Sequence, residues 1–279
     1  PDPGKHEAVT DTRVGSAGTQ RRMIGNRQAY IVLNALPEIG PVRVRQLMEV
    51  FGSPAGILET PRSELVRMRG IGAAAADSIR NWRAVCDPDR ELDKVRRAGA
   101  QLLTLEDAEY PAALREIHDP PLCLYVRGRT ELLDRYRSAI AMVGSRRTTS
   151  YGVQMAEHLS SAAALAGWTV VSGLARGIDT IVHETALKCG GPTLAVIGSG
   201  LGHIYPQENL DLAREIARQG ALASEFPMDM PPSRRTFPMR NRILSGLTLG
   251  TVVVEAGLRS GSLITAAQAL DQNRTVFAV

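Results

Sequence analysis

Four short segments rich in glycine, serine and arginine each follow a run of mainly apolar residues. They are GSRRT at 144–148, SGLARGID at 172–179, GSGLG at 198–202 and AGLRSGS at 256–262. Glycines let backbone amides approach a phosphate, hydroxyls donate to its oxygens, and a helix that starts there adds positive potential. One such segment is weak evidence, because loops after strands are glycine-rich for turn geometry alone. Four of them, three with arginine, predict a binding site for a phosphate-bearing anion.

The stretch 231–245 adds four arginines and contains no acidic residue. Arginine suits phosphate because its planar guanidinium presents several donors, and its face can also stack on a base. We therefore expect Arg240 and Arg242 to face the same groove as Arg146. An alternative remains open for Arg242, in which it stabilises the fold by pairing with Glu225 or Glu255.

Strand-like and helix-like stretches alternate from residue 87 to the end of the chain. The strand-like runs are QLLTL, PLCLYV, AIAMVG, WTVVSG, TLAVIG, ALASEF, TLGTVVVEA and TVFAV. Helices are expected from about Tyr151, Ile178, Asn209 and Ser262, and the run ILSGLTL also has helical character. This alternation implies right-handed crossovers and a mostly parallel sheet. The predicted fold class is α/β with an extended Rossmann-like domain over 87–279, in which ligands bind beyond the carboxyl ends of the strands. Because the chain stops inside an apolar run, we expect this domain to be truncated.

The segment before this domain is helical and contains an internal echo. LPEIGPVRVRQLMEVFG and MRGIGAAAADSIRNW each place an Ile-Gly turn, at 39–40 and 71–72, before an amphipathic helix. The pattern predicts a small all-α domain of helix-hairpin-helix or SAM-like type over 23–86. Its turns could offer amides to a phosphate, or they could serve packing alone. Residues 1–22 show no apolar period and are expected to form a disordered arm.

Composition bounds the class of protein. The 279 residues are 44% hydrophobic and 22% charged, with a net charge of +4, and all but three of the 33 basic residues are arginines. Aromatic residues make up 4%, which argues against a binding face built from many stacked rings. Three scattered cysteines fit a reducing compartment, and no run is long enough for a membrane span. We therefore expect a cytoplasmic protein.

Enzymatic readings find little support in the motifs. The chain has no GxxxxGK[ST] run for ATP, its GSGLGH departs from a dinucleotide fingerprint at His203, and HETAL lacks the second histidine of HExxH. No cofactor or metal is expected. The serious rival is a nucleotide-cleaving enzyme of a related Rossmann-like superfamily, in which Asp179 and Glu255 would act on a ribosyl bond. Both acids also have structural explanations, Asp179 by capping a helix or orienting Arg176, and Glu255 by holding Arg242.

Six motifs in a fixed order carry a resemblance. GSRRTTSYG, VSGLARGID, TLAVIGSGLGHIYPQEN, SEFP, FPMRNRI and VVEAGLRSGSLITA resemble the signature series of the DprA/Smf family, the DNA-processing recombination mediators of natural transformation. The resemblance covers about 26–279. It implies single-stranded DNA binding without chemical change, protection of incoming DNA, help in loading the RecA recombinase, and a homodimer. Val182, Gly202 and His203 depart from the usual family pattern.

The resemblance and the loop chemistry together give one predicted DNA-binding set. Its members are the small, hydroxyl and basic residues of the strand-end loops and the basic stretch: Gly144, Ser145, Arg146, Ser172, Gly173, Gly177, Arg240, Asn241, Arg242, Gly257, Ser260, Gly261 and Ser262. The runs TLGTVVVEA and LITAAQAL are expected to supply apolar surface for the homodimer.

Overall fold

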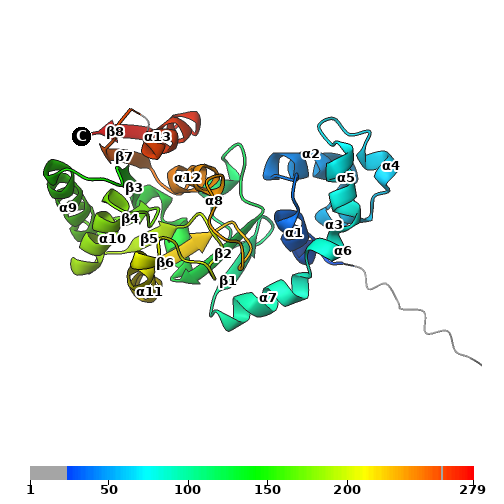
Figure 1. Ribbon diagram of the computed structural model, residues 1–279, viewed down its shortest axis with the longest axis horizontal. Helices are drawn as coiled ribbons and strands as arrows, with labels where there is room; N and C mark the ends of the chain where they lie inside the picture. The colour runs from blue at the N-terminus through cyan, green and yellow to red at the C-terminus, as the bar shows by residue number, and fades with distance from the viewer. Residues whose placement is uncertain (1–23, 259) are drawn as a thin grey trace, which may run out of the picture.

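All eight predicted strand-like runs form strands of one sheet in the computed structural model, which describes residues 24–258 and 260–279 (Figure 1). The strands are β1 (Gln101–Thr104), β2 (Cys123–Gly128), β3 (Ala139–Gly144), β4 (Thr169–Ser172), β5 (Thr193–Val196), β6 (Ala221–Ser224), β7 (Gly250–Glu255) and β8 (Thr275–Ala278). Their order across the sheet is β1-β2-β6-β5-β4-β3-β7-β8. The arm predicted over 1–22 lies outside the described residues.

The pairing confirms a mostly parallel sheet. Neighbouring strands from β6 to β8 pair in parallel, whereas β1 and β2 extend the sheet by antiparallel pairing. From β3 the chain proceeds through β4 and β5 to β6 on one side, and then returns to β7 and β8 on the other side of β3. The loops after β3 and β7 therefore diverge, and such a switch point is where doubly wound sheets bind ligands.

Helices cover both faces of the parallel strands, whose side chains are buried on both sides. Met142 packs into a core beneath one face, and its neighbour Val143 packs into the core of the other. The helices of the first face are α9 (Ser150–Leu165), α10 (Ile178–Lys188) and α11 (Leu210–Gln219), and those of the second are α8 (Ala112–Arg115), α12 (Thr236–Gly246) and α13 (Gly261–Asp271). Short 3-10 turns complete the connections: η1 (Thr130–Asp134), η2 (Tyr136–Ser138) and η3 (Gln207–Asn209).

Helix α12 begins earlier than the sequence indicated. The prediction placed helical character from Ile243 onward, but the helix already includes Phe237, Pro238 and Arg240. Proline is tolerated there because the amide it lacks in a first turn has no intrahelical partner. Arg240 and Arg242 therefore project from a helix and not from a loop, which decides where each guanidinium lies.

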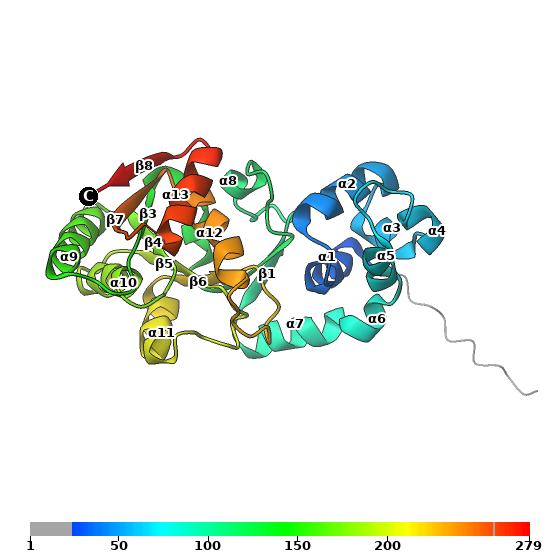
Figure 2. The same cartoon turned by 45° about the horizontal axis from the view of Figure 1, so that its top comes forward.

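The predicted helical region forms a group of short helices at the β1–β2 end of the sheet (Figures 1 and 2). It comprises α1 (Asn26–Ala35), α2 (Pro41–Phe51), α3 (Pro54–Glu59), α4 (Arg62–Leu65), α5 (Ala73–Arg80) and α6 (Trp82–Val85). Both Ile-Gly turns precede helices as predicted, with Gly40 and Gly72 as the N-caps of α2 and α5.

A helix not predicted from the sequence, α7 (Pro88–Arg97), joins the helical group to the sheet (Figure 2). It begins at the Asp87-Pro88 break because the Asp87 carboxylate accepts from the amides of the first turn and proline suits the first helical position. One apolar core runs from Ile31 and Leu33 of α1 to Tyr125 of β2. The division into domains at 86 and 87 remains a prediction.

Within the residues that the structure describes, no helix has both the length and the apolar character needed to cross a membrane.

Candidate functional site

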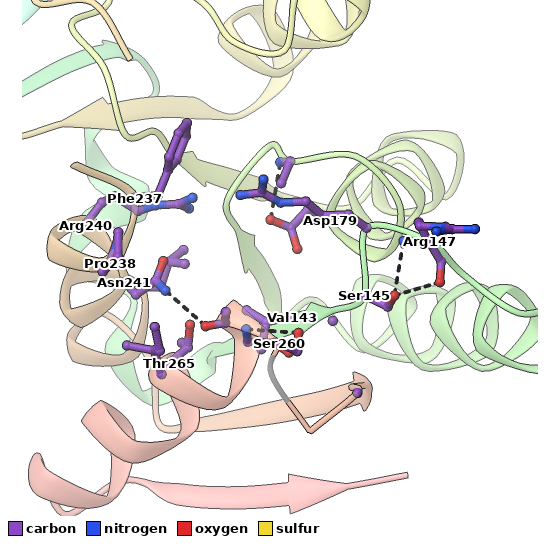
Figure 3. Close-up of a pocket in the computed structure, with 18 of the residues that line it drawn as sticks. Val143, Ser145, Arg147, Asp179, Phe237, Pro238, Arg240, Asn241, Ser260 and Thr265 are labelled. Atoms are coloured by element: carbon purple, nitrogen blue, oxygen red, sulfur yellow. Dashed lines mark hydrogen bonds between the residues drawn. The ribbon is translucent and has the colours of Figure 1, made fainter. Parts of the chain in front are cut away.

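A groove of about 610 Å³ opens at the switch point, where the carboxyl ends of β3 and β7 meet α12 and α13 (Figure 3). Its walls come from the loops after β3, β4 and β7 and from the first turns of the two helices. Nine of the predicted residues line it: Gly144, Ser145, Arg146, Arg240, Asn241, Gly257, Ser260, Gly261 and Ser262. Residues as far apart as Val143 and Thr265, 122 positions along the chain, thus lie around one groove. The fourth predicted loop, 198–202, contributes no residue to this lining.

Arg240 is the buried cation of the groove. Its side chain is only 3% exposed, Nη1 donates to the Val196 carbonyl oxygen at 2.6 Å, and Nε has no hydrogen-bond partner. Burial lowers its pKa to about 10, an effect that Asp179 opposes and Arg146 reinforces. Arg240 therefore stays charged at neutral pH while one of its donors is unsatisfied. A buried donor without a partner is costly, and the retained charge places a cation among the residues that line the groove.

Asp179 is the acid that lies beside this cation. Its Oδ2 accepts from the amides of Gly173 at 3.2 Å and Ala175 at 3.3 Å, which fixes the loop after β4. Burial raises the pKa of Asp179, and the positive charge of Arg240 opposes this shift. The carboxylate thus organises the loop before α10. The expected capping role is not observed, because Gly177 is the N-cap of α10 and no side chain caps it, and Asp179 does not orient Arg176. Arg176 instead forms an ion pair with Glu208.

The loop after β3 is tied to its neighbours by backbone contacts. The Ser145 amide donates to the Glu255 carbonyl at 2.7 Å, and the Ser145 carbonyl accepts from the Ile178 amide at 3.1 Å. Gly177 makes this approach possible, because its φ is +78° and a Cβ there would lie 2.3 Å from the Ser145 oxygen. The segment that carries Ser145 and Arg146 is therefore held at a fixed position in the groove wall.

Arg146 and Phe237 form the aromatic part of the wall. The Arg146 guanidinium carbon lies 5.5 Å from the centroid of the Phe237 ring. Phe237 lines the groove together with Arg234, and neither belongs to the set predicted from the sequence. Both residues lie within the basic stretch 231–245, which was the available signal in the sequence.

The first turn of α13 forms the wall opposite the β3 loop. Ser260 caps the helix, its Oγ accepts from the Ser262 amide at 3.3 Å, and the Asn241 amide nitrogen donates to the Gly261 carbonyl at 3.5 Å. The exposed amides of such a turn and the positive end of the helix dipole favour an anion. This wall therefore adds donors to the charge of Arg146 and Arg240.

Arg242 does not face the groove. Its side chain is buried, and Nη1 and Nη2 donate to the two carboxylate oxygens of Glu225, both at 2.6 Å. Nε lies 2.9 Å from Asp119. Burial lowers the pKa of Arg242, but the pairing with Glu225 raises it more, and the net shift is upward. The expectation that Arg242 joins Arg146 and Arg240 in one groove is therefore wrong in its geometry, and the alternative of pairing with Glu225 is the one observed.

Three further predicted residues lie behind the groove surface. The Ser172 hydroxyl is buried and donates to the Met142 carbonyl at 2.7 Å. Gly173 packs directly against Arg240, since a Cβ at this glycine would lie 2.0 Å from Nη1. Gly177 has the backbone role described above. None of the three lines the groove, but each supports residues or backbone that do.

Glu255 also differs from its expected partner. Its carboxylate accepts from the Thr149 amide at 3.0 Å at the start of α9, and it does not pair with Arg242. In residues 24–258 and 260–279, no group of three or more His, Cys, Asp or Glu side chains could hold a metal ion.

Comparisons with known proteins found a matching family model, similar sequences and similar structures. A family model described as DNA recombination-mediator protein A matches residues 101–279. DNA processing protein DprA of Bacillus subtilis is 46% identical over 190 residues, covering 68% of this chain and 64% of that protein. Protein Smf of Synechocystis is 36% identical over 263 residues, covering 92% of this chain and 65% of that protein. The chain thus spans less than two thirds of the length of these relatives.

Two solved structures share the fold. The X-ray structure of DNA processing protein A from Streptococcus pneumoniae has a TM-score of 0.75 at 32% identity, covering 91% of this chain and 86% of that one. A Helicobacter pylori structure, described as giving insights into the single-stranded DNA binding mode of DNA processing protein A, has a TM-score of 0.58 at 35% identity. It covers 64% of this chain and 80% of its own.

Proposed function

This chain belongs to the DNA recombination-mediator protein A family, and we propose that it binds single-stranded DNA in the groove at the switch point without changing the DNA chemically. The observation that carries the proposal is Arg240, a buried cation among the residues that line the groove. In the low-polarity surroundings of a buried group, its positive charge attracts a phosphate that enters the groove.

The groove presents a second cation and a ring at the same place. Arg146 lies at the groove wall beside Phe237, so one side chain neutralises a phosphate while the other contacts the face of a base. Grooves that combine basic residues with aromatic rings bind single strands, whose unpaired bases are free to stack. The Helicobacter pylori relative, described as binding single-stranded DNA, supports the same class of ligand.

The rival function, cleavage of a nucleotide, finds weaker support. It needs a carboxylate free to exchange a proton with the ligand. Asp179 is committed to two backbone amides and Glu255 to the Thr149 amide. Both carboxylates therefore hold backbone amides in place, and DNA binding in the groove requires no change in these contacts.

The wider role rests on the family. We propose that the protein acts in the cytoplasm, protects incoming single strands and helps to load the RecA recombinase. We also propose a homodimer. Exposed apolar side chains of α13 and β8 support it, since Leu263, Leu270 and Phe277 are each at least 40% exposed. The run TLGTVVVEA does not supply the expected apolar surface with its valines, because Val252, Val253 and Val254 are buried in β7, which pairs with β3 and β8.

Titration of a fluorescein-labelled dT oligonucleotide tests the binding function. We expect anisotropy to rise with protein concentration and to show tighter binding than the same label on a hairpin duplex of equal charge. Incubation with the nucleoside monophosphates should release no free base. Equal affinity for both DNA forms would contradict the proposal of a single-strand site, and release of base would favour the enzyme.

A further inference from the structure

Tyr205 holds an aromatic ring beside the groove but outside the residues that line it. It lies in the loop between β5 and η3, and it is 40% exposed. Its ring centroid lies 5.8 Å from that of Phe237, with 48° between the two planes. A second ring therefore lies next to Phe237, which lines the groove.

The neighbours of the two rings fix their position. A Cβ on Gly198 would lie 2.7 Å from the Phe237 ring, so this ring packs directly on the backbone after β5. Near Tyr205, the pKa of Arg176 is raised mainly by Glu208, with a smaller contribution from Tyr205 itself. Tyr205 thus lies between the Phe237 ring and the Arg176–Glu208 ion pair.

Exposure of a large ring needs an explanation in a chain with few aromatic residues. Three aromatic side chains among the described residues are strongly exposed, namely Tyr151, Tyr205 and Phe277. Of these, Tyr205 is the one whose ring packs on a groove-lining ring. An exposed ring in such a place offers a face to a flat, apolar ligand group.

We propose that Tyr205 is a base-stacking subsite that extends the groove by one nucleotide. The inference rests on the proposed function, single-stranded DNA binding at the same groove. Because the planes of Tyr205 and Phe237 are tilted, the two rings do not continue one stack, and each takes a different base along a strand that bends between them. The charge of the nearby Arg176 is matched by Glu208. Contact at Tyr205 is therefore made through the base and not through a phosphate.

Two substitutions of Tyr205 test this subsite. Tyr205→Ala should weaken binding of a dT oligonucleotide roughly 5- to 150-fold, the range expected for loss of one stacked base. Tyr205→Phe keeps the ring and should bind within about threefold of the wild type. Tyr151→Ala is the matched control, because this exposed tyrosine lies on α9 and does not line the groove, and it should have no effect.

Two further readouts separate stacking from a structural role. Tyr205→Ala should leave the dependence of affinity on salt unchanged, since no phosphate contact is lost. Its effect should also disappear with an oligomer of abasic tetrahydrofuran residues, which retains the phosphates. Equal weakening for the dT and abasic oligomers would overturn the subsite, as would wild-type affinity of Tyr205→Ala for dT.

A tryptophan at this position reports the contact directly. Tyr205→Trp should bind dT with emission that is quenched on saturation, and the abasic oligomer should not quench it. Bound dT without quenching would overturn the inference while leaving single-strand binding intact. If the wild-type protein bound neither oligomer, the proposed function itself would fail.

Discussion

Arg240 and Arg242 show how two identical side chains, two positions apart, acquire opposite roles. Successive residues of an α-helix are rotated by about 100°, so these two project roughly 200° apart. Arg240 reaches the groove and keeps an unsatisfied donor, whereas Arg242 turns inward to Glu225 and Asp119. The first contributes positive charge to the groove, and the second has its charge neutralised inside the protein.

The buried pair should therefore govern stability. Arg242→Ala removes one partner and leaves the Glu225 carboxylate buried and unpaired, which should lower the free energy of unfolding by about 3–5 kcal/mol. Replacing both residues, with Arg242→Met and Glu225→Leu, should cost less than the single change because no lone charge remains. Urea denaturation followed by circular dichroism measures both. A single variant as stable as the wild type would contradict the structural assignment of Arg242.

At the scale of elements, the sequence predicted what depends on local pattern. The ends of all eight strands were predicted to within two residues, and the starts of α9, α10, α11 and α13 to within one, because apolar runs and the turn residues between them mark these elements. The start of α12 was missed because Pro238 resembles a break, although proline fits a first turn.

Features set by tertiary approach were not predictable in the same way. Gly173 and Gly177 were predicted to contact phosphate. In the structure, a side chain at Gly173 would collide with Arg240, and a side chain at Gly177 would collide with the Ser145 oxygen. Phe237 and Tyr205 meet only after folding, since 32 residues separate them in the sequence. These contacts depend on which loops meet in the folded protein, and the sequence of one segment alone does not determine this.

The outer surface of α13 and β8 gives a prediction at the same scale. If it forms a homodimer, sedimentation at micromolar concentration should give twice the 30.1 kDa chain mass. Leu270→Arg should then shift the protein toward monomer, because a charge would enter the apolar contact. Leu165→Arg is the control, since Leu165 is 73% exposed on α9, on the opposite face of the sheet. A monomeric wild type, or equal effects of both substitutions, would contradict this interface.

At the scale of the whole molecule, the helical group and the groove lie at different parts of one sheet. The helical group packs on β1 and β2, while the groove lies at β3 and β7, with β4, β5 and β6 between them. Every groove-lining residue lies between 143 and 265. The helices therefore share a core with the sheet, and our proposal places DNA binding in the groove.

The salt dependence of affinity tests this assignment most directly, because each phosphate contact on a single strand contributes a slope of about −0.7 in a log–log plot. Arg146→Ala should make the slope for a dT oligonucleotide shallower by about 0.7 and weaken binding roughly ten- to a hundredfold. Arg137→Ala is the matched control, because Arg137 is an exposed arginine of η2 that is not among the residues lining the groove. We predict that Arg137→Ala changes neither quantity appreciably. If it changed both as much as Arg146→Ala does, binding would depend on diffuse positive charge, and the account of a specific phosphate site in this groove would be contradicted.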